Sequence, residues 1–320
     1  AEVFEADDYP PAAAALVVDW DETTGELTIQ TDQAGHTALV GGGGMSAFKV
    51  HLYEYFTRSA IENGASHFLC ENNTFVNAEV KCGTAESLLD VEDVQVLNND
   101  FIYAQACPLT FVTRQRSDGF LQKRTDMLVE NNLFLYPERA TVYVGIDWGR
   151  ANTNGLILKN IIVRNNEIRL NRYWDGRMVF LTRWGYDTDN IEYSDNEIYF
   201  DEPANRMEDV FRMLVASGDV ASDVRIVNNT FAGDGAGYVP RFEKFTEIFD
   251  TDQLTISNNA FEGPGLINLE NCWGVDVSGN LLTDVNAVLD ATNCRWVTFS
   301  GNVVGEEGDW ISNNKTMLRF

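Results

Sequence analysis

Nine asparagines recur along the chain in one local pattern, and this repeat constrains the fold more than any other feature. The residue before each of them is Asn, Asp or Gly, the types that best tolerate a left-handed backbone. Apolar residues stand two places after each asparagine and three and five places before it. The pattern predicts a strand, a bend at the asparagine and a second strand. The nine residues are Asn73, Asn99, Asn132, Asn166, Asn196, Asn229, Asn259, Asn280 and Asn302.

The spacing of the asparagines discriminates between two repeat folds. Successive spacings are 26, 33, 34, 30, 33, 30, 21 and 22 residues. A leucine-rich repeat also carries an asparagine among apolar positions, but its period is about 20–29 residues and it needs a leucine-rich half. Most spacings here are longer, and the intervening segments look like further strands and loops. We therefore predict an all-β, right-handed parallel β-helix of about 9–11 coils, stacked about 4.8 Å apart, with the asparagines hydrogen-bonded in an internal ladder.

The repeat resembles that of the pectate-lyase-like superfamily of parallel β-helix proteins, over about residues 60 to 310. The resemblance implies an enzyme that degrades or modifies an extracellular polysaccharide. The paired-Asp and Gly-His-Gly blocks of polygalacturonases, the Asp-Pro-His block of mannuronan epimerases and the Arg-x-Pro-x-x-Arg of pectate lyases are missing. The three histidines, His36, His51 and His67, lie before or at the first clear coil. A histidine acid or base in the middle of the stack is therefore excluded.

The N-terminal segment differs from the rest of the chain. Residues 1–45 do not repeat, and we expect them to form an N-terminal cap or an irregular first coil, because the end of a solenoid must be covered. We expect residues 46–320 to form the β-helix domain. The segment 48–56 could be a strand or a cap helix.

The chain is strongly acidic, with a formal net charge of −26. This charge argues against nucleic acid and anionic membranes as partners, because both would be repelled. The sequence has no apolar run of the roughly 18 residues that a membrane-spanning helix needs. We expect an exported protein, secreted or periplasmic, and a homo-oligomer is plausible because solenoids of this kind often associate side by side.

The five cysteines are too few for a disulfide scaffold, and none forms a C-x-x-C pair. Cys272 and Cys294 each precede a ladder asparagine by eight residues, so we expect them at one position on adjacent coils. They could form a buried thiol ladder or a disulfide. Cys82 and Cys107 have a similar relation and the same ambiguity.

Charge is unevenly distributed along the chain. Residues 114–225 carry 15 Lys and Arg against 18 Asp and Glu, whereas the other 208 residues carry 8 against 31. The middle coils could therefore tolerate an acidic glycan whose carboxylates or sulfates are held by arginines. Alternatively, these arginines only neutralise neighbouring carboxylates on a stacked surface.

An alignment of the strands that end in a charged residue places Arg114, Asp147 and Arg183 in one column on three consecutive coils. We predict these three as the catalytic residues. Aromatic rings beside charged groups are common in sugar-binding surfaces, although a salt-bridge ladder under a tryptophan lid would look the same. The segments 114–124, 147–155 and 183–190 are predicted to be long loops that wall a groove. The predicted substrate-binding residues are Trp148, Trp184, Arg150, Tyr186 and Lys123.

Two mechanisms fit such a groove, and the Arg concentration slightly favours a lyase acting on an acidic polysaccharide. A glycoside hydrolase needs two carboxylates, one of them protonated, and Asp147 between two arginines would suit only the nucleophile or base. No cofactor is expected, except that Asp187 and Asp189 with Asp147 could hold Ca²⁺. The alternative to an enzyme is a non-catalytic glycan-binding or adhesive β-helix, or a module of a viral tail spike.

Overall fold

The computed structural model of the protein contains two compact units, Ala1–Thr57 and Arg58–Phe320. The structure describes residues 2–5, 13–21, 26–31, 48–51, 59–63, 67–76, 78–82, 90–104, 107–113, 122–137, 140–146, 156–170, 178–200, 207–215, 219–233, 242–262, 266–283, 289–305 and 318–319.

The N-terminal unit contains a four-stranded sheet in the order β3-β2-β1-β4. Its pairings are antiparallel, so the described strands of this unit are not a coil of a parallel solenoid. The first part of segment 48–56 is a strand, because β4 pairs with β1. This unit extends to Thr57, beyond the expected residue 45. The strands are β1 (Glu2–Glu5), β2 (Ala13–Asp21), β3 (Glu26–Thr31) and β4 (Phe48–His51).

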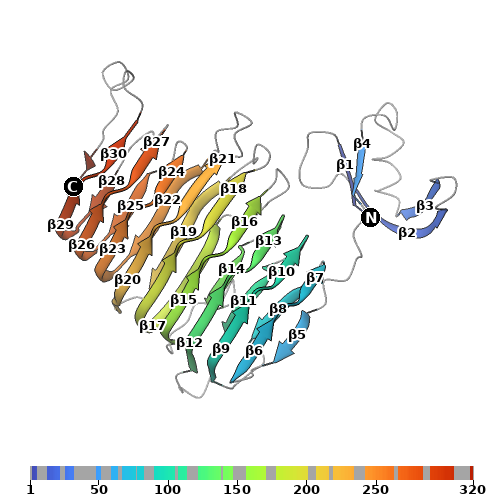
Figure 1. The fold of residues 1–320 in the computed structure, drawn as a ribbon, viewed down its shortest axis with the longest axis horizontal. Coiled ribbons are helices and arrows are strands. Elements are labelled where there is room, and N and C mark those ends of the chain that lie inside the picture. The colour runs from blue at the N-terminus through green and yellow to red at the C-terminus, as the bar shows by residue number, and fades with distance from the viewer. Residues whose placement is uncertain are drawn as a thin grey trace. The chain divides into compact units, whose positions relative to one another are not determined.

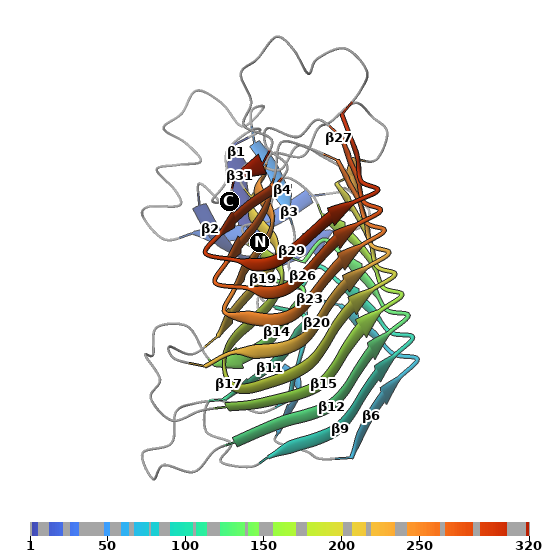
Figure 2. The same cartoon turned by 90° about the vertical axis from the view of Figure 1, so that its left-hand side faces the viewer.

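The second unit is a parallel β-helix, as the asparagine repeat predicts (Figure 1). We name its three sheets by their order around each coil. The first sheet precedes the asparagine, and its strands stack in chain order (Figure 2). These strands are β6 (Phe68–Glu71), β9 (Val91–Leu97), β12 (Gln122–Glu130), β15 (Leu156–Arg164), β17 (Met178–Ser194), β20 (Ala221–Val227), β23 (Thr251–Ser257), β26 (Trp273–Ser278) and β29 (Arg295–Ser300).

The second sheet follows the asparagine and consists of short strands. All of its pairings are parallel, so each coil adds one strand to its edge. Its strands are β7 (Thr74–Val76), β10 (Asp100–Ile102), β13 (Leu133–Leu135), β16 (Glu167–Leu170), β18 (Glu197–Phe200), β21 (Thr230–Gly233), β24 (Ala260–Glu262), β27 (Leu281–Thr283) and β30 (Val303–Val304).

The third sheet closes each coil. Strand β17 is long enough to cross from the third sheet into the first, which joins the two sheets at this coil. The other strands of the third sheet are β5 (Ser59–Asn63), β8 (Glu79–Cys82), β11 (Leu109–Thr113), β14 (Val142–Ile146), β19 (Met207–Val215), β22 (Phe242–Phe249), β25 (Ile267–Glu270), β28 (Leu289–Thr292) and β31 (Leu318–Arg319).

Residues with a left-handed backbone bend each coil at two places. The residue before every ladder asparagine has a positive φ, between 54° and 66°, as predicted. A second column of positive φ lies five residues earlier and bends the first sheet itself. This second bend is not predicted by the sequence, because the residue types there are mixed: His67, Asp93, Asp126, Asn160, Asn190, Asp223, Gln253, Gly274 and Trp296.

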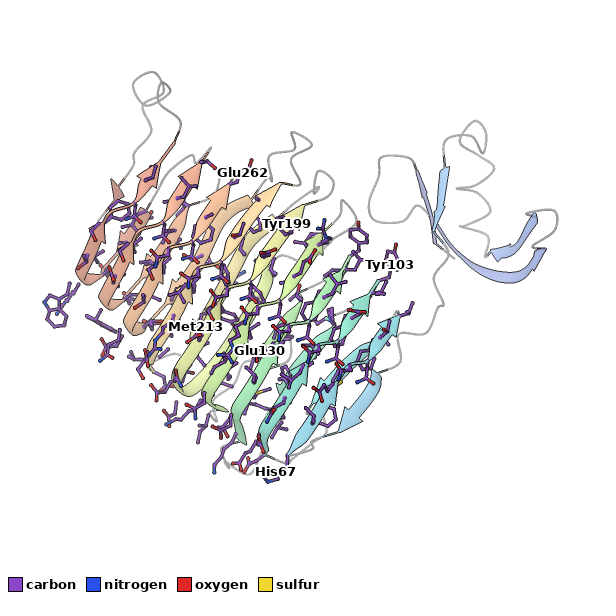
Figure 3. The ribbon with its side chains drawn as sticks, in the orientation of Figure 1. His67, Tyr103, Glu130, Tyr199, Met213 and Glu262 are labelled. Carbon is purple, nitrogen blue, oxygen red and sulfur yellow. The ribbon has the colours of Figure 1, made fainter. Side chains whose placement is uncertain are left out.

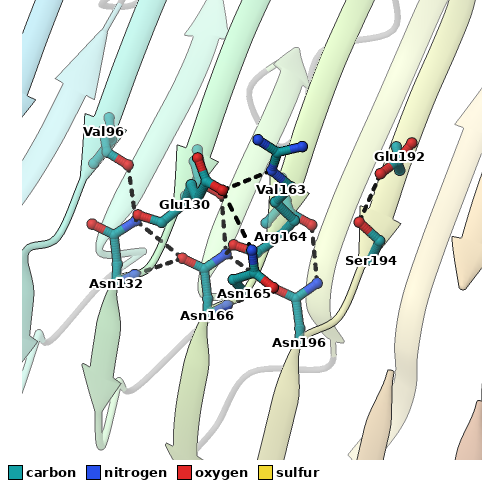
Figure 4. Close-up of polar contacts among 11 residues, drawn as sticks. Val96, Glu130, Asn132, Val163, Arg164, Asn165, Asn166, Glu192, Ser194 and Asn196 are labelled. Carbon is teal, nitrogen blue, oxygen red and sulfur yellow. Dashed lines mark hydrogen bonds and ion pairs between the residues drawn. The ribbon is translucent and has the colours of Figure 1, made fainter. Parts of the chain in front are cut away.

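The ladder asparagines bind one another from coil to coil (Figure 4). The side-chain amide of Asn132 donates to Oδ1 of Asn166 at 3.0 Å, and its backbone N–H donates to the same oxygen at 3.0 Å. The amide also donates to the backbone oxygen of Val96 at 2.9 Å, so it connects three coils. The predicted internal ladder is confirmed, and the stacking is compatible with the right-handed form of the fold.

Apolar side chains stack inside the coils as regularly as the asparagines do. The rings of Phe75, Phe101 and Phe134 stack at centroid distances of 4.9 and 5.0 Å. The inward residues of the three sheets form one continuous buried core. Among the described residues there is no helix with the length and apolarity to cross a membrane.

Candidate functional site

The predicted catalytic column is not in the expected register. Arg183 pairs with Gly145 of β14 and with Leu214 of β19, whereas the sequence alignment placed it opposite Asp147. The sequence alignment was wrong here, because strand ends on successive coils do not coincide. Arg114 and Asp147 themselves lie outside the described residues, as do Trp148 and Arg150.

The segment 183–190 is not a loop, because it lies within the continuous strand β17. Its backbone pairs with β15, with one irregularity near Gly185. The expectation of a loop failed because, of the Gly, Asp and Asn residues in this segment, only Asn190 has a positive φ, and the others belong to the strand without such a bend. The side chains of Arg183, Trp184 and Tyr186 lie outside the described part of the chain.

Three predicted site residues are described together with their partners. The Lys123 ammonium lies 3.5 Å from the Glu92 carboxylate. The Lys159 ammonium lies 2.8 Å from the Asp187 carboxylate, and this contact raises the pKa of Lys159 above its usual value. Asp189 accepts a hydrogen bond of 2.6 Å from Ser222. Within the described ranges, no group of three or more His, Cys, Asp or Glu residues could hold a metal ion.

The ion pairs of the described basic residues on the middle coils are made with carboxylates on the same or a neighbouring coil. Most of these pairs are exposed, so each contributes little stability on its own. This arrangement favours the interpretation that these basic residues neutralise neighbouring carboxylates on the stacked surface, rather than holding the acidic groups of a glycan. The pairs are Lys123–Glu92, Lys159–Asp187, Arg164–Glu130, Arg169–Glu167, Arg212–Glu247 and Arg225–Asp223.

The outer face of the third sheet carries the least exposed of these pairs. Arg212 and Glu247 are in register on β19 and β22, and their side chains meet at 2.8 Å with exposed fractions of 23% and 9%. Tyr143 belongs to the same outward column two coils earlier and is buried. It packs with Ala140 and Cys107, apart from the main core. The described part of this face is therefore largely covered.

An open face lies on the second sheet, where three tyrosines and an arginine follow one another on four consecutive coils. The rings of Tyr103 and Tyr136 lie 5.7 Å apart, and the Arg169 guanidinium lies 5.3 Å from the centre of the Tyr199 ring. The backbone N–H of Tyr136 donates to the carbonyl of Arg169, which links the two halves. We call Tyr103, Tyr136, Arg169 and Tyr199 the tyrosine row. Figure 3 shows Tyr103 and Tyr199 on the same edge of the β-helix.

Carboxylates border the tyrosine row. The Tyr199 hydroxyl donates to Glu197 at 2.9 Å, and Arg169 binds Glu167 at 2.7 Å. Glu167 and Glu197 are directly opposite each other on neighbouring strands. Partial burial and the hydrogen bond to Glu197 raise the pKa of Tyr199, so its hydroxyl stays protonated and remains a donor.

Aliphatic side chains flank the tyrosine row on the coils of Tyr103 and Tyr136 and continue to the coil before them. Ile102 and Leu135 are in register with Val76 on the outer face of β7, β10 and β13, and Val76 is 62% exposed. A rigid surface with exposed rings, a guanidinium and bordering carboxylates offers both apolar contact and hydrogen bonds.

The sequence contains a signal for the tyrosine row in the distance of each member from its ladder asparagine. Tyr103 and Tyr136 each stand four residues after a ladder asparagine, and Arg169 and Tyr199 stand three residues after one. These residues are about 30 positions apart and form no local motif, so only alignment on the asparagines brings them together.

Comparisons with known proteins do not add to this picture. No protein-family model, no curated protein and no solved structure matches the chain.

Proposed function

We propose that this protein is a carbohydrate-active β-helix of the pectate-lyase-like kind, which holds a polysaccharide along the tyrosine row. The observation that carries the proposal is the row itself, in which Tyr103, Tyr136, Arg169 and Tyr199 follow one another along the stack. Neighbouring coils are about 4.8 Å apart, so a linear glycan that runs along the stack meets a ring or a guanidinium on each coil.

The chemistry of the row suits sugars. A tyrosine ring packs on the apolar face of a pyranose and keeps its hydroxyl for a hydrogen bond. Glu167 and Glu197 can accept hydrogen bonds from sugar hydroxyls, and the Arg169 guanidinium can donate to them. The partly exposed Arg169 and Tyr199 are already held by these carboxylates, which reduces the entropy cost of binding.

The charge of the row favours a neutral or mixed glycan at this face. Arg169 is paired with Glu167, and Glu197 adds a second carboxylate, so there is no excess of positive charge to attract an acidic sugar. The net charge of −26 opposes the approach of acidic polymers in general. A secreted or periplasmic location would place the protein where polysaccharide is met.

A lyase centre that includes Arg183 is a second candidate, which the sequence suggests. Arg183 lies on β17, between the strands that carry Tyr143 and Arg212. Tyrosine and arginine are residue types that can serve proton abstraction beside a carboxylate. In this case an acidic polysaccharide would be cleaved, and Asp147 and Arg114 are the other catalytic candidates from the sequence.

The test is a panel of neutral and uronate-containing polysaccharides. Binding is measured by retardation in native gels cast with each polysaccharide, and cleavage by reducing ends and by the ultraviolet absorbance of unsaturated products. We expect retardation by at least one polysaccharide, and weaker retardation of Tyr136→Asn. No retardation in any gel, or full retardation of the variant, would reject the tyrosine row. Binding without either product would identify a binding or adhesive module rather than an enzyme.

A further inference from the structure

Two cysteines face each other on the eighth and ninth ladder coils. The backbone N–H of Cys272 points at Sγ of Cys294 at 3.4 Å. The flanking bonds, from Asn271 N–H to the Thr292 carbonyl and from Arg295 N–H to the Cys272 carbonyl, place the two residues in direct register. The structure contains both as free thiols. The sequence expectation that they share one position on adjacent coils is confirmed.

No other described pair of cysteines has this relation. Val80 pairs with Leu109, so Cys82 is level with Phe111 and not with Cys107. The expected similarity between Cys82 and Cys107 was therefore wrong. Cys107 has a half-buried thiol without a cysteine in register, which makes it a matched control.

The separation of the two residues permits a cross-link. Neighbouring strands lie about 4.7–4.9 Å apart, within the Cα separation of about 4.4–6.8 Å that disulfides adopt. Their Cβ atoms prefer about 3.5–4.5 Å in a disulfide, so a bond between directly opposed cysteines pulls the coils together slightly. Such a strained bond is easily reduced, which is typical of regulatory disulfides and not of permanent ones.

The two thiols differ in reactivity. Cys272 is buried, and its Sγ lies 3.4 Å from the Glu270 carbonyl. Cys294 is partly exposed, and its pKa is lowered to about 7 by the hydrogen bond from Cys272, although burial and the nearby Asp290 and Glu270 oppose this effect. A partly exposed thiolate attacks disulfides, whereas a buried thiol resolves the product.

We propose that Cys272 and Cys294 form a reversible disulfide that joins the eighth and ninth ladder coils in response to a small-molecule disulfide such as oxidised glutathione. The Cys294 thiolate attacks one sulfur of the oxidant, and the first thiolate of the oxidant leaves. The Cys272 thiol then loses its proton and attacks Sγ of Cys294, which releases the second thiolate. The two cysteines lose two electrons and two protons, and the oxidant becomes two thiols.

A disulfide at this position would stabilise the ninth coil against local opening. Val297, Phe299 and Val304 on the ninth coil are only partly buried, whereas the equivalent residues Val275, Val277 and Leu282 on the eighth coil are fully buried. The ninth coil is thus less well packed, and such regions open most readily. A covalent bond between these coils closes a short loop and opposes this opening.

The experiment equilibrates the full chain in buffers with different ratios of oxidised to reduced glutathione, followed by acid quenching and intact mass. We expect a product lighter by two hydrogen atoms, a cross-link between Cys272 and Cys294 in the peptide map, and a higher melting temperature. Cys107→Ser should behave like the unaltered protein, and Cys294→Ser should give no cross-linked product. Cys272→Ala should instead stop at the glutathione adduct of Cys294.

Two results would overturn the proposal. The first is a chain that keeps its reduced mass at every glutathione ratio while its thiols react fully after unfolding. The second is a cross-link that survives in Cys294→Ser, which would show that other cysteines form it. Intact mass and cross-link mapping do not depend on glycan binding, so the proposed function and this inference can fail separately.

Discussion

Asn259 donates a hydrogen bond of 2.9 Å from its side-chain amide to Oδ1 of Asn280, although only 21 residues separate them. Asn132 makes the same bond to Asn166 at 3.0 Å across 34 residues. The contact is constant while the length of the coil varies by more than half. Extra residues are therefore accommodated between the sheets, where loops can lengthen at little cost, and the ladder sets the vertical register of the stack.

The ladder predicts a graded response to removal of its members. Asn229 is fully buried, and its side-chain amide donates to the backbone oxygens of Tyr193 and Val227 and to Oδ1 of Asn259. Asn229→Ala should lower the free energy of unfolding by about 1–3 kcal/mol, because buried partners lose their hydrogen bonds. Asn302→Ala, on the partly exposed last rung, should cost less. Urea denaturation measures both, and equal losses would contradict the role of burial.

The bend before each asparagine predicts a preference for residue type at Gly279, where φ is 66°. Ala and Asn both add a Cβ that displaces the exposed Asn258 side chain, so the comparison isolates the backbone. Gly279→Ala should be about 1 kcal/mol less stable than Gly279→Asn, because Asn tolerates the left-handed region. Thermal melting compares the two variants. Identical melting temperatures would show that the positive φ is not a constraint.

Much of the fold could be predicted because its determinants repeat in the sequence. The residue before each ladder asparagine is always Asn, Asp or Gly, so this bend is visible without a structure. The second bend is not, since the same backbone conformation is adopted by Gln253 and Trp296, two types that rarely signal it. There the hydrogen bonds of the flanking parallel strands impose the conformation on whichever residue is present.

The site was harder to predict than the fold, because it depends on register across coils of unequal length. Arg183 pairs with Gly145, two positions before the Asp147 with which the sequence alignment matched it, and no local pattern reveals this register. Tyr136 and Tyr199 failed to stand out for a similar reason. Each looks like an ordinary strand residue until the coils are aligned on their asparagines.

The tyrosine row predicts a specific loss of glycan binding. Tyr136→Asn keeps the left-handed backbone that Tyr136 adopts, and it should weaken binding roughly fivefold, or about 1 kcal/mol, through loss of one ring contact. Trp296→Asn is the matched control, because Trp296 is an exposed aromatic with positive φ outside the row. Affinity gels with the polysaccharide from the panel measure both. Equal weakening in the two variants would indicate non-specific contact.

For the Arg212–Glu247 pair, we expect a single substitution to lower the free energy of unfolding much more than the double substitution does. Arg212→Met leaves the Glu247 carboxylate, 9% exposed, without this cation and should destabilise the protein by about 3 kcal/mol. Arg212→Met with Glu247→Leu should recover most of that loss, since two apolar side chains replace the pair. Arg169→Met removes an exposed pair and should cost less than about 1 kcal/mol. Urea denaturation of the four proteins tests this order, and a double variant as unstable as the single one would contradict it.

The thiol of Cys294 predicts a pH dependence that can be measured without any oxidant. Its pKa of about 7 is lower than usual because the Cys272 thiol donates a hydrogen bond to it. Only the thiolate reacts with iodoacetamide, so the rate at Cys294 should rise with pH through a midpoint near 7, where roughly half the thiol is ionised. In Cys272→Ala the side-chain hydrogen bond is lost, while the hydrogen bond from the backbone N–H of residue 272, burial and the carboxylates of Asp290 and Glu270 remain. The midpoint should then move to higher pH, and peptide-resolved alkylation that shows the same midpoint in both proteins would contradict the hydrogen bond as its cause.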